Sequence, residues 1–136
     1  MITAQSNDVL ARMIERSAAG VFGKTDLSTA VAAGDWLVLF AGEAGKRPET
    51  ADLAVILPEI AKDRAKAGCG ELSIAVVNAE DEDDLSAEYG VLVKPTVVFV
   101  RDGDVKGLVP RIKNWAEYEQ KLAEFLPVTL ERRADA

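Results

Sequence analysis

The sequence predicts an α/β fold in which helices flank a mixed sheet of four to five strands, and two features carry this prediction. Apolar segments 36–40 and 72–78 are typical of strands, and the long amphipathic segment between them indicates a parallel strand-helix-strand unit. Segments 96–101 and 104–109 are rich in β-branched residues and are separated only by an Asp-Gly pair, as in an antiparallel hairpin. The sheet should therefore contain both parallel and antiparallel neighbours.

The N-terminal third should contribute two helices and an edge strand before the first central strand. Apolar residues at helical spacing predict a helix over residues 7–19, and residues 21–22 fit a short edge strand. Thr25 can cap a short helix over 26–33. The strand 36–40 is apolar throughout, which favours a central position covered on both faces.

Three further helices are predicted from the 3.6-residue spacing of apolar side chains, over residues 51–67, 82–89 and 114–125. Asn114 is a suitable cap for the last of them. Trp115 and Tyr118 lie at helical spacing and are expected to pack in the core. Pro95 stands at the start of a strand, where a residue without a backbone N–H is tolerated and a cis bond can form a tight corner.

The composition limits the classes of function. A chain of 136 residues fits one domain, expected over residues 1–127, followed by a flexible C-terminal tail over 128–136. The net charge of −7 argues against nucleic acid and anionic membrane surfaces as partners. No signal-peptide pattern and no long apolar run is present, so a cytoplasmic location without membrane insertion is expected.

Histidine is absent and cysteine occurs once, at Cys69. The lack of histidine excludes Ser-His-Asp and Cys-His nucleophiles and most zinc sites, so neither a metal nor another cofactor is expected. Cys69 precedes a parallel strand and should lie at the end of the sheet opposite Pro95. It is either an incidental loop residue or a reactive thiol, and the second reading would make the protein a monothiol reductase or peroxidase.

Residues 18–25 fit a loose phosphate-loop pattern that ends in Gly23, Lys24 and Thr25. That motif binds phosphate when a strand leads into a glycine-rich loop that opens a helix. Here a predicted helix precedes the loop, and only one glycine lies inside it. The sequence therefore does not favour nucleotide binding.

Five consecutive acidic residues follow the strand 72–78: Glu80, Asp81, Glu82, Asp83 and Asp84. They lack the ligand spacing of a calcium loop. They could simply favour the positive N-terminal end of the helix 82–89. They could also form one wall of an acidic docking face, because strand direction places them at the same end of the sheet as Pro95 and as Lys46 and Arg47. Lys46 and Arg47 are either solvated loop charges or part of that site.

The order of elements resembles the thioredoxin fold over residues 26–126, and Lys94-Pro95-Thr96 matches the cis-proline corner of that fold. A redox thioredoxin carries Cys-x-x-Cys after its first core strand, whereas residues 40–50 here contain no cysteine. Thiol exchange needs an attacking thiolate and a second, resolving sulfur. The resemblance thus implies the thioredoxin-like fold without its enzymatic activity.

The chain also resembles the hydrogenase expression/formation proteins of the HupG and HyaE type. Three stretches carry this resemblance: Lys46-Arg47-Pro48-Glu49; Tyr89-Gly90-Val91 with Pro95, Thr96 and Phe99; and Gly107 with Ile112, Trp115 and Ala116. It implies a chaperone for [NiFe] uptake hydrogenase maturation. Such a chaperone would bind the small-subunit precursor and its twin-arginine signal peptide, delay export until assembly is complete, and meet other hydrogenase accessory proteins. A thioredoxin-like scaffold of an unrelated complex is the other alternative.

The expected mode of binding is the addition of an extended peptide as a strand beside Pro95. Carboxylates would then bind the arginines of the peptide through charge-assisted hydrogen bonds. The residues expected in this peptide-binding site are Glu80, Asp81, Glu82, Asp83, Asp84, Val93, Lys94, Pro95, Thr96, Lys46 and Arg47.

Overall fold

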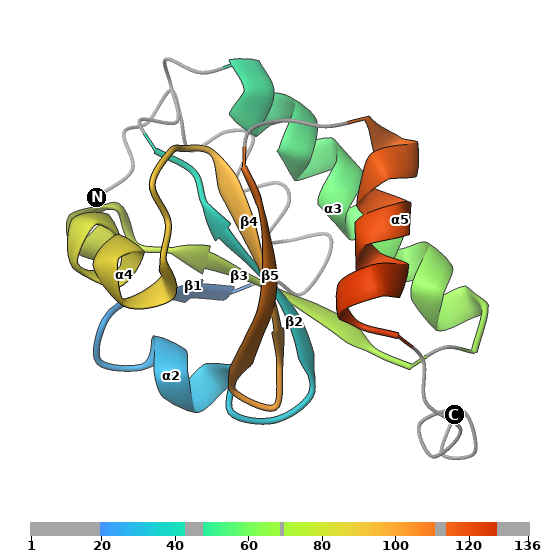
Figure 1. Ribbon diagram of the computed structural model, residues 1–136, viewed down its shortest axis with the longest axis horizontal. Coiled ribbons are helices and arrows are strands. Elements are labelled where there is room, and N and C mark those ends of the chain that lie inside the picture. Colours follow the sequence, from blue (N-terminus) through green and yellow to red (C-terminus); the bar gives the residue numbers. More distant parts are fainter. Residues whose placement is uncertain (1–19, 43–47, 69, 111–113, 128–136) are drawn as a thin grey trace.

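The computed structural model describes residues 20–42, 48–68, 70–110 and 114–127, which form a five-stranded sheet between two layers of helices (Figure 1). The strands are β1 Gly20–Phe22, β2 Asp35–Phe40, β3 Leu72–Val77, β4 Thr96–Arg101 and β5 Asp104–Pro110. Their spatial order is β1-β3-β2-β4-β5. The predicted α/β class is confirmed, and the arrangement is thioredoxin-like. The expected helix 7–19 and tail 128–136 lie outside the described residues.

The sheet is mixed, as predicted. β3 pairs in parallel with β1 and β2, while β4 pairs antiparallel with β2 and β5. The short strand predicted near residues 21–22 is present at the edge of the sheet as β1. Asp102 and Gly103 both adopt positive φ angles, of 51° and 85°, which the tight two-residue hairpin turn requires.

The strand register defines two ends of the sheet. Thr96 pairs with Phe40 on one side and with Pro110 on the other, so the start of β4 lies beside the ends of β2 and β5. We call this the proline end, because Pro95 directly precedes β4. The opposite end carries the turn between β4 and β5, and Leu72, the first residue of β3, also lies there.

Within the described residues, α-helices cover both faces of the sheet (Figure 1). The helices α3 Pro48–Lys66 and α5 Trp115–Phe125 lie on one face, and α2 Leu27–Ala30 and α4 Glu82–Tyr89 lie on the other. A short 3₁₀ helix, η2 Ala79–Asp81, leads into α4 and was not expected from the sequence. Asn78 caps η2 through its side chain, which accepts a hydrogen bond from the N–H of Glu80.

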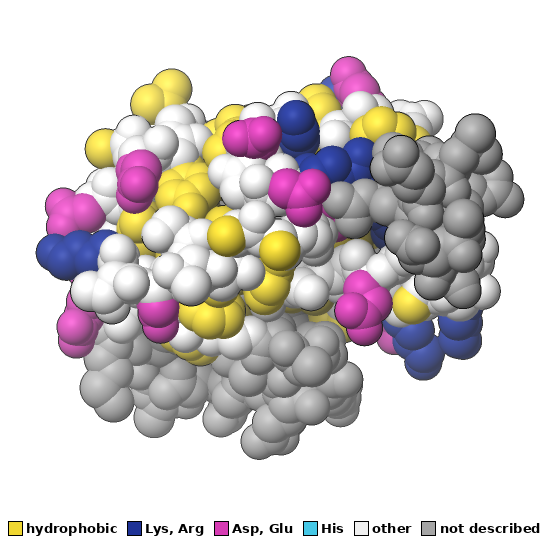
Figure 2. Space-filling view, turned by 90° about the horizontal axis from the view of Figure 1, so that it is seen from below, with side chains coloured by type: hydrophobic (Ala, Val, Ile, Leu, Met, Phe, Trp, Pro, Cys, Tyr) yellow, Lys and Arg dark blue, Asp and Glu magenta, His cyan; other side chains and the backbone are white. Residues whose placement is uncertain are grey.

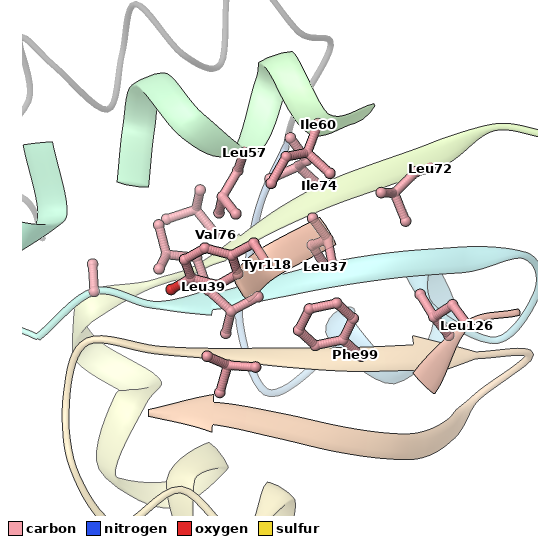
Figure 3. Close-up of a cluster of buried hydrophobic side chains, with 13 residues drawn as sticks. Leu37, Leu39, Leu57, Ile60, Leu72, Ile74, Val76, Phe99, Tyr118 and Leu126 are labelled. Atoms are coloured by element: carbon pink, nitrogen blue, oxygen red, sulfur yellow. The ribbon is translucent and has the colours of Figure 1, made fainter. Parts of the chain in front are cut away.

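The core lies on both faces of β2. Leu37 and Leu39 pack with Leu57 of α3 and Tyr118 of α5, and Figure 3 shows this cluster. Val38 and its alternate neighbour Phe40 pack on the other face, against α2 and α4. Each such side chain contributes about 1.5–3 kcal/mol when it is fully buried. Burial on both faces explains why this strand is apolar without alternation.

Two expectations about helix ends and the core were wrong. The N-cap of α2 is Asp26 and not Thr25: Asp26 Oδ1 accepts a hydrogen bond of 2.7 Å from the N–H of Gly23 and so fixes the turn before the helix. Trp115 is 37% exposed, because it is the first residue of α5, whereas Tyr118 is buried as expected. The predicted cap Asn114 is confirmed by a 2.8 Å hydrogen bond from the N–H of Glu117.

A buried ion cluster stabilises the end of the sheet opposite the proline end. Asp35, the first residue of β2, accepts hydrogen bonds from Arg64 Nη2 at 2.9 Å and from Arg101 Nε at 2.7 Å. Arg101 Nη2 also donates to the carbonyl of Pro127. The cluster therefore links α3, β2 and β4 to the residues that follow α5.

Candidate peptide-binding site

The corner at Pro95 has the geometry predicted from the sequence. The Lys94–Pro95 peptide bond is cis. Pro95 and Thr96 are buried, and Thr96 Oγ1 donates a short hydrogen bond of 2.6 Å to the carbonyl of Val93. The backbone on both sides of the cis bond is thus fixed by contacts within the corner.

The loop that leads into the corner is also held at its first residues. Gly90 ends α4 with a left-handed φ of 78°, a conformation that favours glycine. The next residue, Val91, is buried, and its N–H donates to the carbonyl of Ser86 at 2.8 Å. Leu92 follows and is 95% exposed, while Val93 is 36% exposed. Two apolar side chains therefore project from a loop that is fixed on both sides.

Glu82 connects three segments at the proline end. Its side chain is only 7% exposed, yet its carboxylate oxygens accept the N–H of Gly42 at 3.1 and 3.2 Å. Glu82 Oε1 also forms an ion pair with Lys94 Nζ at 3.2 Å. Burial raises the pKa of Glu82 above its usual value, and the bonds from Lys94 and Gly42 oppose that shift. One carboxylate thus joins the segment after β2, the start of α4 and the cis-proline corner.

Lys94 also pairs with Asp83. The distance from Lys94 Nζ to Asp83 Oδ1 is 3.3 Å, and the Asp83 side chain is fully exposed. Lys94 directly precedes Pro95, although the site predicted there would bind a positively charged peptide. The structure shows that its charge is neutralised by two neighbouring carboxylates. Lys94 therefore leaves the corner without an exposed excess of positive charge.

The other half of the acidic run is directed toward the turn after β1. Asp81 Oδ2 accepts a 3.0 Å hydrogen bond from the N–H of Lys24, and Asp84 Oδ2 pairs with Lys24 Nζ at 3.2 Å. A Cβ atom at position 23 would collide with the Asp81 carboxylate, so this turn needs the glycine. Asp84 raises the pKa of Lys24 through their hydrogen bond.

These contacts bear on the phosphate-loop pattern. The predicted edge strand β1 directly precedes Gly23, but α2, which follows the loop, has only four residues. The N–H groups of Gly23 and Lys24, which would face a phosphate, already donate to Asp26 and Asp81. Carboxylates of the chain thus accept the hydrogen bonds that a bound phosphate would need.

The acidic run agrees with the simpler of the two interpretations made from the sequence, in which it begins a helix. Glu82, Asp83 and Asp84 form the first turn of α4, where the helix dipole favours negative charge. Glu80 belongs to η2 and is exposed. The structure thus brings Glu82 and Asp83 together with Lys94 at the corner, and it turns Asp81 and Asp84 toward β1. The docking role of the run stays a prediction.

Several predicted or alternative site residues cannot be placed. Lys46, Arg47 and Cys69 lie outside the described residues. β3, the strand that follows Cys69 in the chain, begins at the end of the sheet opposite the proline end. Within the described ranges, no group of three or more acidic, histidine or cysteine side chains is arranged to hold a metal ion. Nor does any helix in those ranges combine the length and apolarity needed to cross a bilayer.

Comparison with known proteins identifies the family. Residues 9–118 match the family model described as Hydrogenase-1 expression protein HyaE. The chain belongs to the HyaE family. The matched region contains the whole corner described above, from Gly42 to Pro95, and the family resemblance read from the sequence is confirmed.

Relatives of this HyaE-family chain carry similar descriptions. It is 35% identical over 104 residues to the hydrogenase expression/formation protein HupG of Bradyrhizobium diazoefficiens, covering 76% of this chain and 65% of the relative. It is 36% identical over 90 residues to HupG of Rhizobium leguminosarum bv. viciae, covering 66% and 58%. It is 30% identical over 125 residues to the hydrogenase expression/formation protein HoxO of Cupriavidus necator, covering 91% and 76%. The chain thus spans less than two-thirds of both HupG relatives.

Three features of the acidic run and the proline corner were missed from the sequence of this HyaE-family chain. Gly42 contributes only its backbone N–H, and Lys24 meets Asp84 across 60 positions of sequence, so no local pattern marks either contact. Leu92 stands between buried Val91 and the proline corner. Its exposure follows from the path of the loop, which periodicity does not reveal.

Proposed function

We propose that this HyaE-family protein acts in hydrogenase maturation as a chaperone without catalytic activity. It binds the precursor of the hydrogenase small subunit together with its twin-arginine signal peptide, and it delays export until assembly is complete. The family match and the names of the relatives support the role in hydrogenase expression and formation. Because the precursor is held before export, the proposed location is the cytoplasm, and other hydrogenase accessory proteins are further proposed partners.

The observation that carries this proposal is a cis-proline corner bordered by carboxylates in a chain whose residues 40–50 contain no cysteine. Thiol exchange at this corner would need an attacking thiolate and a resolving sulfur. A corner with a fixed backbone, in a chain without a cysteine in residues 40–50, is suited to holding an extended polypeptide. The alternative, a monothiol reductase or peroxidase using Cys69, stays a prediction, because Cys69 lies outside the described residues.

In the proposed mechanism, backbone groups of the precursor pair with the residues just before Pro95, which is strand addition at the corner of the sheet. A guanidinium of the signal peptide then binds Asp83, whose carboxylate is exposed. It competes there with Lys94, which retains Glu82 as its partner. The buried carboxylate of Glu82 thus stays paired throughout the exchange. Glu80, Lys46 and Arg47 complete the proposed site.

The test is calorimetry with a synthetic twin-arginine signal peptide at low and high salt. We expect binding that weakens as salt is added, because exposed charges are screened. Asp83→Asn should weaken binding about two- to fivefold, the usual worth of an exposed ion pair. Asp83 is the residue changed because its side chain is fully exposed, whereas Asp81 and Glu82 accept backbone N–H groups and Asp84 pairs with Lys24.

Asp104→Asn is the matched control, since Asp104 is an exposed acidic residue at the opposite end of the sheet. It should bind the peptide as the unmodified protein does. Absence of binding by the unmodified protein at low salt would overturn the proposed function. If the affinity changes neither with added salt nor in Asp83→Asn, the acidic residues take no part in peptide binding.

A further inference from the structure

The proline end presents an apolar feature that charge recognition does not explain. Leu92 is the most exposed of the large apolar side chains in the described ranges, and Val93 beside it is partly exposed. Burial of such side chains against a partner removes apolar surface from water, which is favourable in proportion to the area covered. A pair of this kind next to a proposed binding site is a candidate contact surface.

The loop holds these two side chains in place. Val91, on one side, is buried and bonded through its N–H to Ser86. On the other side, the carbonyl of Val93 accepts a hydrogen bond from the Thr96 hydroxyl. A contact surface that is already ordered loses less entropy when a partner binds. Leu92 therefore differs from an apolar side chain on an unrestrained surface loop.

The chemistry around the loop indicates what kind of partner fits. Lys94 lies two positions after Leu92 and touches the exposed carboxylate of Asp83, so the apolar pair borders negative charge. Glu80 and Asp84 add exposed carboxylates in the same acidic run. With a net charge of −7, two copies of this chain would repel one another at this surface. A segment with basic residues next to apolar ones is complementary to both features.

We propose that Leu92 and Val93 bind the apolar residues of a peptide whose neighbouring basic residues face Asp83. This inference rests on the proposed function and deepens it, because it adds a second chemical requirement to the ligand. A signal peptide meets that requirement, since it joins a positively charged segment to an apolar one. Charge provides the salt-dependent part of binding, and the apolar pair provides a part that salt does not screen.

The experiment uses three synthetic peptides and two protein variants. The peptides are a twin-arginine signal peptide, a form with its apolar residues changed to serine, and a form with its arginines changed to glutamine. Leu92→Ser tests the apolar contact. Val105→Ser is the control, because Val105 is 42% exposed and lies near the hairpin turn at the opposite end of the sheet. Circular dichroism checks that both variants remain folded.

We expect Leu92→Ser to weaken binding of the intact peptide about tenfold at both salt concentrations, as loss of one buried leucine contact implies. It should not change binding of the serine-substituted peptide, which lacks the partner side chains. Val105→Ser should bind all three peptides as the unmodified protein does.

The outcomes separate the two proposals. If the unmodified protein binds the signal peptide but Leu92→Ser binds it equally well, the apolar contact is wrong and the proposed function stands. Equal losses in Leu92→Ser and Val105→Ser would indicate unspecific apolar adhesion and would also overturn the contact. If the unmodified protein binds none of the peptides, the proposed function fails, and this inference fails with it.

Discussion

Glu82 accepts hydrogen bonds from Gly42 and Lys94 while its side chain is buried at the start of α4. In the sequence, Glu82 is one of five consecutive acidic residues, and nothing distinguishes it from the other four. Its neighbours differ in role: Asp83 is exposed beside Lys94, and Asp81 and Asp84 bind Lys24. The acidic run could be predicted as a helix start, but the role of each carboxylate depends on segments far away in sequence.

The burial of Glu82 predicts a specific pH dependence of stability. Its pKa is raised in the folded state, mainly by burial, above the value of about 4.3 expected in an unfolded chain. Above the folded pKa the buried charge lowers stability. As pH falls through that pKa the folded protein takes up the proton first, so stability is regained until the unfolded chain is protonated as well.

The free energy of unfolding of the unmodified protein should therefore rise relative to that of Glu82→Gln as pH is lowered from 7 toward about 4.5. Urea unfolding of both proteins across this range measures the difference directly. A difference that stays constant, or that falls as pH is lowered, would contradict the burial of an ionised Glu82 in the folded state.

Lys94 provides a second prediction for single residues. In Lys94→Gln the exposed carboxylate of Asp83 loses its internal cation, so a basic peptide no longer has to compete for it. We expect the twin-arginine peptide to bind several-fold more tightly at low salt. The same change leaves buried Glu82 without its cation and should lower the free energy of unfolding by roughly 1–3 kcal/mol.

Calorimetry and urea unfolding of Lys94→Gln measure the two effects separately. Lys24→Gln is the control for stability, because it removes a pair between two exposed side chains and should change unfolding little. Weaker peptide binding by Lys94→Gln would show that Lys94 contacts the ligand directly and does not compete with it.

At the level of secondary structure, the sequence predicted most elements because each has a local signal. Apolar runs marked β2 and β3, an Asp-Gly pair marked the hairpin, and Asn114 marked the start of α5. The errors arose where a local signal competes with a distant contact. Asp26 is the cap of α2, and Trp115 lies at the exposed first position of α5, a detail of packing that helical spacing alone does not determine.

The contact between β5 and α5 gives a prediction at this scale. Gly107 of β5 pairs with Phe99 of β4, and a Cβ atom at position 107 would collide with the ring of Phe125. Phe125 packs against Phe99 with ring centroids 5.4 Å apart. Gly107→Ala should therefore lower the free energy of unfolding by about 1–3 kcal/mol, the usual cost of overpacking.

A double-mutant cycle with Phe125→Leu isolates the cause. If the ring is the obstacle, Gly107→Ala should cost less in the Phe125→Leu background than in the unmodified protein. Equal losses of unfolding free energy in the two backgrounds, measured by urea unfolding, would show that the added methyl group does not act through the ring of Phe125.

At the scale of the whole molecule, the two ends of the sheet carry different ion pairs. The ion cluster of Asp35 with Arg64 and Arg101 lies at the end of the sheet opposite Pro95. Figure 2 views the molecule from below and shows acidic, basic and apolar side chains intermixed on the surface seen from that side. At the proline end, Lys94 pairs with Glu82 and Asp83, and the exposed Leu92 and Val93 directly precede it in the chain. The two ends of one sheet thus differ in chemistry.

The fold and the cis-proline corner could be predicted as a whole because strand order and Pro95 restrict the topology strongly. The composition of the corner could not. It depends on the contacts of Glu82 with Gly42 and Lys94, which are distant in sequence. It also depends on the path of the loop, which exposes Leu92. Such contacts, between residues 12 and 40 positions apart, follow from the packed structure and not from any repeating pattern.

The central claim is that this HyaE-family chain holds a polypeptide at the cis-proline corner. The most direct test is to map backbone amide chemical shifts of the isotope-labelled protein during titration with a twin-arginine signal peptide. We expect the largest shifts at Asp83, Leu92, Val93 and Thr96, with little change near Gly103. Shifts that concentrate around the hairpin turn, or a spectrum that does not change at saturating peptide, would contradict it.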